Sequence, residues 1–167
     1  MQGVEEEEIR YRPIGIIHSP FKDVRRGIPI QPTGAEGIFG TVEVFPEFCE
    51  GLKDIEGFSH IILVYHFHRS KGYSLLVKPF VDDQKRGVFA TRAPRRPNPI
   101  GISVVRLVRV EGCTLHVEGV DILDGTPLLD IKPYVPEFDA RNNVRIGWLE
   151  EKVHFVRKKR SDDGFEG

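Results

Sequence analysis

Residues 102–125 read ISVVRLVRVEGCTLHVEGVDILDG, and this stretch restricts the fold more than any other part of the chain. Gly112 and Gly119 divide it into short runs that are rich in valine, leucine and isoleucine. Short apolar runs bounded by glycine are typical of strands joined by turns. The stretch therefore predicts strands that break at the two glycines, with Arg106 and Arg109 lying between apolar neighbours.

Strand-like segments recur along the rest of the chain. Residues 37–46 alternate in polarity, with Val42 and Val44 on one face. Residues 59–68 are rich in β-branched and aromatic side chains, which suits a largely buried strand. Further strands are expected over residues 9–17, 86–91 and 145–157, and a short helix over residues 47–55. The pattern predicts an all-β or β-dominated chain that forms a single small β-barrel with short helices.

The composition is that of one globular domain. The chain has 167 residues, of which 40% are hydrophobic and 29% charged, and its formal net charge is −1. We place the barrel domain at residues 9–157, between charged tails at residues 1–8 and 158–167. The sequence contains no GxGxxG fingerprint, P-loop, HExxH or GxSxG motif, so a non-Rossmann fold is expected.

The cysteines and the N-terminus bear on the cellular compartment. Cys49 and Cys113 are the two cysteines, and they form no CxxC pair. This count argues against a disulfide scaffold and predicts two buried thiols in a cytoplasmic protein. The acidic run at residues 5–8 has the wrong sign for a secretory signal, and no stretch is long enough for a transmembrane helix.

Residues 91–103, TRAPRRPNPIGIS, form the most specialised segment. Its three prolines fix φ and hold the preceding residues extended, so the segment is stiff. Stiffness lowers the entropic cost of presenting Arg92, Arg95 and Arg96, whose planar guanidinium groups suit carboxylate or phosphate. The alternative is a solvated surface loop whose arginines pair with neighbouring acids.

Three other segments carry similarly distinctive sequences: IGIIHSPFKD at residues 14–23, IEGFSHIILVYHFHRS at 55–70 and LLDIKPYVPEFD at 128–139. Together with GVFATRAPRRPNPIGIS at residues 87–103, they resemble the TsaA-like family of tRNA methyltransferases. The resemblance extends over roughly residues 9–139, and four separated motifs in the same order make it specific.

The resemblance implies an S-adenosylmethionine-dependent enzyme that is built on a small β-barrel and works as a homodimer. Its implied reaction is methylation of the N6 nitrogen of threonylcarbamoyladenosine beside the anticodon of tRNA. No metal and no membrane are implied. Two rival interpretations stay open, namely a module that binds S-adenosylmethionine or RNA without turnover, and a methyltransferase that acts on another substrate.

The resemblance also places the cofactor among the motifs. Arg92 and Lys132 are the expected partners of a carboxylate or phosphate group, and the alternative for both is an ion pair with Asp130 or another local acid. The cofactor-binding residues expected from the resemblance are Pro20, Phe21, Lys22, His66, Phe67, Arg92, Leu129, Asp130, Ile131 and Lys132.

The chemistry needs a group that draws the proton from a poorly nucleophilic urea nitrogen. A positioned acceptor contributes roughly 10²–10⁴ in rate. Asn98, whose side-chain oxygen is followed by a proline-fixed carbonyl at Pro99, is one candidate for a catalytic role, and Asp130 is the other. The sequence does not choose between them.

Basic residues supply the expected RNA contacts. One set is Lys22, Arg25 and Arg26, a second is Arg95 and Arg96, and a third is formed by residues 157–160, although each set alone is also typical of a solvated face. His66 and the histidine two residues later share one strand face, but no third ligand lies near them in sequence, so no metal is expected.

Overall fold

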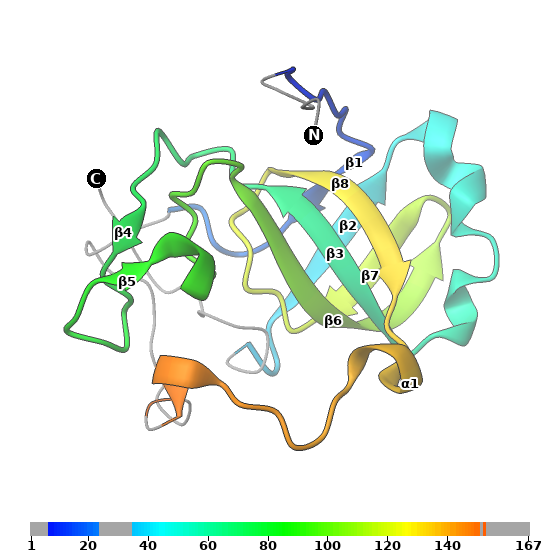
Figure 1. Ribbon diagram of the computed structural model, residues 1–167. Coiled ribbons are helices and arrows are strands. Elements are labelled where there is room, and N and C mark those ends of the chain that lie inside the picture. Colours follow the sequence, from blue (N-terminus) through cyan, green and yellow to red (C-terminus); the bar gives the residue numbers. More distant parts are fainter. Residues whose placement is uncertain (1–6, 24–34, 151, 153–167) are drawn as a thin grey trace.

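The computed structural model describes residues 7–23, 35–150 and 152. Its centre is a closed barrel of six antiparallel strands in the order β1-β2-β7-β6-β3-β8 (Figure 1). The strands are β1 (Gly15–His18), β2 (Phe39–Val44), β3 (His60–His66), β6 (Ile100–Glu111), β7 (Thr114–Glu118) and β8 (Thr126–Pro133). The expectation of a small, non-Rossmann β-barrel is confirmed.

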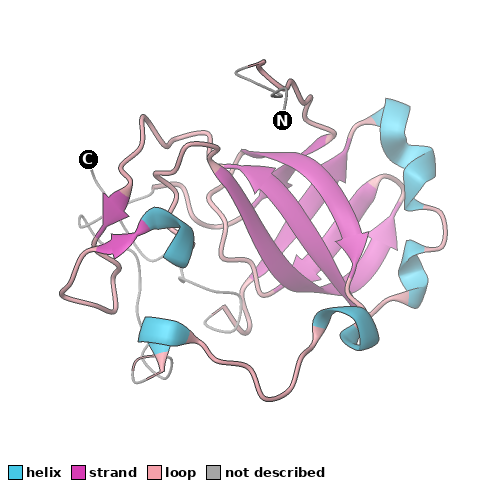
Figure 2. Cartoon of the chain, viewed as in Figure 1, coloured by secondary structure: helices cyan, strands magenta, loops and turns pink. Residues whose placement is uncertain are grey.

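Only short elements lie outside the barrel in the described part of the chain (Figure 2). β4 (Leu76–Val77) and β5 (Arg86–Gly87) form a separate two-stranded sheet. The helices are η2 (Pro46–Leu52), η3 (Ile55–Gly57), η4 (Val88–Ala90), α1 (Pro136–Asp139) and η5 (Gly147–Leu149). None of the described helices has the length and apolar character needed to cross a membrane.

The glycines that divide residues 102–125 act as predicted. β6 ends one residue before Gly112, β7 ends one residue before Gly119, and both glycines have positive φ, at 59° and 91°. A side chain is strained in this left-handed region, so glycine permits the chain to reverse there. The β6–β7 hairpin follows directly from this punctuation.

Two strand predictions were wrong. Residues 86–91 form a strand only at Arg86–Gly87 and then turn into η4, which Thr91 closes by donating its hydroxyl to the carbonyl oxygen of Val88 at 2.8 Å. Residues 147–149 form η5 instead of a strand, because Gly147 turns the chain at a φ of 59°. Residues 151 and 153–157 of that prediction lie outside the described residues.

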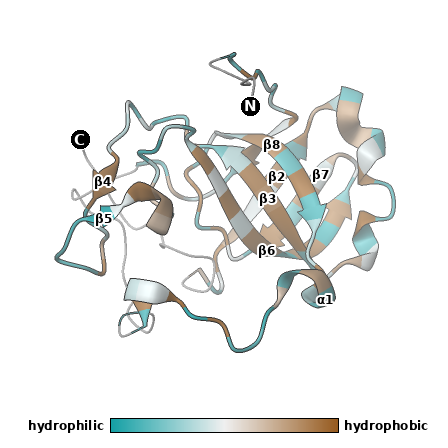
Figure 3. Cartoon of the chain, in the orientation of Figure 1, coloured by the Kyte–Doolittle hydropathy of each residue, from teal (hydrophilic) through white to brown (hydrophobic). Residues whose placement is uncertain are grey.

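The core fills the inside of the barrel. Alternate residues of each strand point inward, and those with the lowest exposure are Ile17, Val42, Ile61, Leu63, Val105, Leu115, Val117 and Leu128, each exposed by 1% or less. The loop at residues 119–125 covers one end of the barrel and adds Val120 and Ile122 to the same core. Figure 3 shows the hydrophobic residues along β3 and β6.

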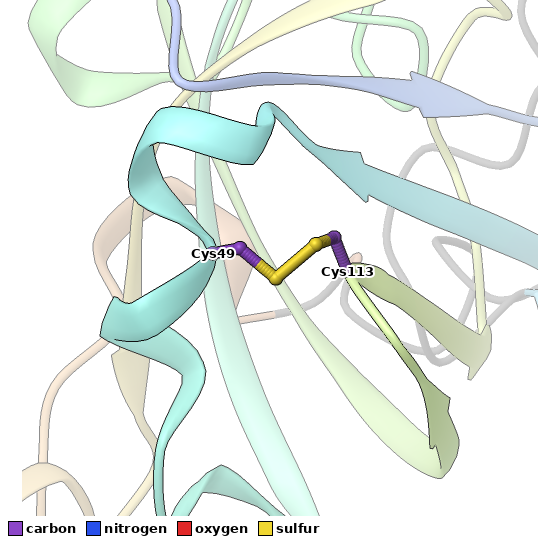
Figure 4. Close-up of a disulfide and its surroundings, with 2 residues drawn as sticks. All are labelled: Cys49 and Cys113. Atoms are coloured by element: carbon purple, nitrogen blue, oxygen red, sulfur yellow. A yellow bond between two sulfur atoms is a disulfide. The ribbon is translucent and has the colours of Figure 1, made fainter.

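The prediction of two buried thiols was wrong. Cys49 on η2 and Cys113 in the β6–β7 turn form a disulfide, with an S–S distance of 2.06 Å, and both residues are partly exposed (Figure 4). Their Cα atoms lie 5.3 Å apart, which is within the range that a disulfide spans. The two positions are 64 residues apart in sequence, so only the closure of the barrel brings them together.

Candidate functional site

One end of the barrel collects most of the predicted site residues. β1, β3 and β7 end there, and β2, β6 and β8 begin there, and we call this end the mouth. At the mouth His66 lies opposite Ile100, and Tyr65 lies opposite Leu128. Three loops extend from it, at residues 19–23, 91–99 and 119–125.

The loop at residues 91–99 is held by hydrogen bonds at both of its ends. The backbone N–H of Phe67 donates to the carbonyl oxygen of Pro99 at 2.8 Å, which attaches the loop to the end of β3. Nη1 of Arg96 donates to the carbonyl oxygens of Thr91 at 3.0 Å and Ala93 at 3.1 Å. Part of the Arg96 guanidinium is therefore used to fix the loop itself.

The other two arginines of the loop have different surroundings. Arg92 is exposed, and its positive charge acts on two groups inside the mouth, Tyr65 and Asp121. Arg95 is partly buried, and its Nε atom is buried without a hydrogen-bond partner among the described residues. A buried donor that is left unpaired is costly, so this atom is available to an anionic group of a ligand.

The segment at residues 19–23 packs against the loop at residues 119–125. The backbone N–H of Ser19 donates to Oδ1 of Asp124 at 2.9 Å, and Asp124 in turn donates its N–H to the carbonyl oxygen of Phe21 at 2.7 Å. Nζ of Lys22 lies 2.6 Å from Oδ2 of Asp124 and holds the pKa of that carboxyl below its usual range. Lys22 is thus ion-paired, while Pro20 and Phe21 border the mouth.

The end of β3 brings two aromatic rings to the mouth. Tyr65 is buried, and its ring contacts that of Phe67 edge to face, with centroids 5.5 Å apart. A Cβ atom on Gly101 would lie 2.5 Å from the Tyr65 ring and 2.6 Å from the Phe67 ring, so only glycine leaves room for this pair. His66 alternates with Tyr65 and lies on the outer face of the barrel.

The predicted segment from Leu129 to Lys132 begins near the mouth and leads away from it. A bulge leaves Leu129 without a partner on β3 and places Asp130 opposite Val64 on the outer face. Nζ of Lys132 lies 2.9 Å from Oδ2 of Asp130, and this carboxylate raises the pKa of Lys132. The ion pair that the sequence offered as an alternative for Lys132 is present.

A hollow of about 540 Å³ lies at the opposite end of the barrel from the mouth and reaches the same β8 segment. Its apolar lining comes mainly from η2 and η3, including Phe48, Leu52 and Ile55, and Asp130 and Ile131 border it. The structure therefore places the predicted cofactor residues in two groups, one at the mouth and one along β8.

A polar chain inside the mouth was not expected from the sequence. Oη of Tyr65 lies 2.8 Å from Oγ of Ser103, which donates to Oδ1 of Asp121 at 2.6 Å. Burial raises the pKa of Asp121 to about 7, against the opposing effects of the Ser103 hydrogen bond and the Arg92 charge, and burial also raises the pKa of Tyr65. The available signal was Asp121 itself, an acid between Val120 and Ile122 in an otherwise apolar run.

The remaining predicted residues are Asn98, in the loop at residues 91–99, and two arginines of the N-terminal part. Asn98 is exposed at the start of β6, where its carbonyl oxygen accepts the N–H of Ile100 at 2.7 Å. Arg25 and Arg26 lie outside the described residues. Within residues 7–23, 35–150 and 152, no group of three or more His, Cys, Asp or Glu side chains is placed to hold a metal ion.

These features define a class of protein: a small barrel that presents arginines, aromatic rings and a buried acid at one end, without a Rossmann sheet. The family model of the tRNA-methyltransferase O N-terminal domain matches residues 16–140. The chain belongs to this family, the TrmO or TsaA-like family.

Individual relatives agree with the family match. A probable S-adenosyl-L-methionine-binding protein of Pyrococcus abyssi is 69% identical over 94% of this chain and 85% of its own length. A crystal structure of TrmO from Pseudomonas aeruginosa has a TM-score of 0.71 and 43% identity, over 85% of this chain and 63% of that one. The tRNA (adenine(37)-N6)-methyltransferase of Mus musculus is 33% identical over 97% of this chain but 38% of its own length. The chain thus spans less than two thirds of the last two proteins.

Proposed function

We propose that this protein is an S-adenosylmethionine-dependent methyltransferase that methylates the N6 nitrogen of the adenosine beside the anticodon of tRNA. The observation that carries the proposal is the family match over residues 16–140 together with the fold shared with TrmO. The relatives, an S-adenosyl-L-methionine-binding protein and a tRNA (adenine(37)-N6)-methyltransferase, support this cofactor and this substrate class. Within that class, the threonylcarbamoyl form of the adenosine is the substrate that we expect.

The donor groups at the mouth fit this cofactor. S-adenosylmethionine carries a carboxylate, an adenine ring and a sulfonium whose methyl group it supplies when bound. The Arg92 guanidinium suits the carboxylate, and the edge of the Phe67 ring and neighbouring apolar surface suit the adenine. The main-chain groups of the β8 segment, from Leu129 to Ile131, are the proposed partners for the polar edges of the adenine.

The proposal includes a two-fold dimer. The outer face of β3 and β6 is apolar, although an outer face is usually polar. Its apolar residues are Ile62, Val64, Ile100, Ile102 and Val104. Ile100 and Ile102 are 40% and 49% exposed. A second copy seated on this face would cover it, because exposed apolar patches of this kind mark interaction surfaces.

A single substitution tests the dimer. Ile102→Glu places a charge at the centre of the outer apolar face, so the protein should become monomeric in light scattering at micromolar concentration. Val144→Glu is the matched control, since Val144 is 58% exposed and lies outside the barrel strands. A wild-type protein that is already monomeric would contradict the dimer.

We also propose that the protein acts in the cytoplasm, where its tRNA substrate would be found. The disulfide does not decide the compartment, because intracellular proteins of hyperthermophiles also contain disulfides.

Mass spectrometry tests the reaction. The protein is incubated with bulk tRNA and S-adenosylmethionine that carries a labelled methyl group, and the tRNA is digested to nucleosides. The label should appear in one modified adenosine of N6-methyl type. Binding of the cofactor in calorimetry without any labelled nucleoside would instead support a non-catalytic binding module, and label in another nucleoside would indicate a different substrate.

A further inference from the structure

The hydrogen-bonded side chains of Tyr65, Ser103 and Asp121 lie where apolar side chains would be buried at a lower cost in free energy. Tyr65 and Ser103 are 5% and 2% exposed, and the next inward positions of the same strands are Leu63 and Val105. Polar groups in such positions destabilise the fold unless they are hydrogen-bonded. The hydroxyl groups of Tyr65 and Ser103 are hydrogen-bonded because the series ends on the carboxylate of Asp121.

The direction of the hydrogen bonds follows from the number of protons. Ser103 has one hydroxyl proton, and it donates that proton to Oδ1 of Asp121 at 2.6 Å. Its oxygen is then left to accept the hydroxyl proton of Tyr65, 2.8 Å away. These hydrogen bonds therefore fix the orientation of the Asp121 carboxylate, which is the last member of the polar chain.

The other acids near the mouth are less suited to take up a proton. Asp124 is held by Lys22 at 2.6 Å, which keeps its pKa low. Asp130 is paired with Lys132 on the outer face and accepts the N–H of Ile131 at 2.9 Å. Asn98 carries an amide, which accepts hydrogen bonds but is not basic at neutral pH.

The surroundings of Asp121 give it the proton affinity of a general base. Burial raises the pKa of its carboxyl to about 7, and a base works best when its pKa lies near the operating pH. The groups that face it are Tyr65 and Ser103 from β3 and β6 and Arg92 from the loop at residues 91–99. The hydrogen bond from Ser103 and, to a lesser degree, the charge of Arg92 lower the pKa of the carboxyl against the effect of burial.

We propose that the carboxylate of Asp121 accepts the proton of the attacking substrate nitrogen, and that Ser103 and Tyr65 position it; this inference rests on the proposed function. The nitrogen forms its new bond to the methyl carbon while the bond from that carbon to sulfur breaks. The electron pair of the broken bond stays on sulfur, which becomes a neutral thioether. The N–H proton passes to Asp121 and from there to water, so that charge and atoms balance.

The test uses the full chain and three variants. Asp121→Asn keeps the shape and can still accept the hydrogen bond from Ser103, but it cannot take a proton. Asp139→Asn is the matched control, because Asp139 is an exposed acid in α1 at the far end of the barrel. Tyr65→Phe removes only the far end of the chain.

Three measurements are made on each protein. Single-turnover methylation of tRNA should fall by about 10²–10⁴ in Asp121→Asn and stay at the wild-type rate in Asp139→Asn. Calorimetry should give the same affinity for S-adenosylmethionine in all proteins. Carbon-13 NMR of labelled aspartate carboxyls, without any ligand, should show one carboxyl that titrates near neutral pH, is missing in Asp121→Asn and titrates at a shifted pH in Tyr65→Phe.

The outcomes separate the two hypotheses. An active wild-type protein with an equally active Asp121→Asn variant would overturn the role of Asp121 and leave the proposed function standing. A wild-type protein that binds the cofactor but methylates no tRNA would overturn both. A slow Asp121→Asn variant that also lost cofactor affinity would show a binding role and would overturn the assignment as a base.

Discussion

Removal of the disulfide should cost the fold a large part of its stability. The bond between Cys49 and Cys113 closes a loop of 64 residues that contains β3 and β6. In the chain-entropy account, a crosslink across a loop of this length lowers the entropy of the unfolded chain by about 14 cal/mol/K. At 25 °C this corresponds to about 4 kcal/mol in the free energy of unfolding.

The assay is equilibrium unfolding in guanidinium chloride of the wild type and of Cys49→Ser/Cys113→Ser. We expect the double variant to unfold at lower denaturant concentration by the equivalent of about 4 kcal/mol. The reduced wild type should behave like the variant, and added reductant should leave the variant unchanged. A loss of less than about 1 kcal/mol, with the bond verified as oxidised in the wild type, would refute the reasoning.

Three further predictions concern the mouth. Arg92→Ala should weaken S-adenosylmethionine binding by about 1.5–3 kcal/mol in calorimetry, since a charge-assisted hydrogen bond is lost; unchanged affinity in a folded variant would refute its role. Asp121→Asn should gain roughly 2–4 kcal/mol of stability relative to wild type between pH 4 and pH 8. The raised pKa of about 7 makes the folded wild type hold a proton that the unfolded chain releases, so wild-type stability falls as pH rises through this window; urea unfolding at both pH values checks it, and a constant difference would contradict it. Arg95→Ala should reduce the salt slope of tRNA binding by about 0.7–0.9, whereas Arg96→Ala should mainly lower the melting temperature because it frees two loop carbonyls; the reverse result would exchange the two roles.

The barrel could be predicted from the sequence because the ends and faces of its strands are determined by nearby residues. Gly112 and Gly119 end strands through their own backbone freedom, and the alternation at Val42 and Val44 marks an inward face. Patterns of this kind depend on a few neighbouring residues, so they can be recognised without the structure. The prediction of a strand over residues 86–91 was wrong because the chain turns into η4 there. The Thr91 hydroxyl closes this turn, although the residues are of types that favour strands.

Interactions between distant segments could not be predicted in the same way. The disulfide joins positions that become neighbours only when the barrel closes. The polar chain from Tyr65 through Ser103 to Asp121 crosses three segments, and none of its members is unusual in its own segment except the acid. Lys132 and Asp130 lie two positions apart on one strand face, which is why their ion pair was within reach of sequence reasoning.

The circular order of the six barrel strands has a consequence for how the protein can associate. Each of the six is paired with a neighbouring strand on both sides over part of its length, so the barrel has no edge strand along which another strand could add over its full length. Among the described residues, β4 and β5 are the strands that are paired on one side only over their whole length. A partner that docks on the barrel must therefore be recognised through side chains, and a single substitution can change the partner without disturbing the backbone that holds the mouth together.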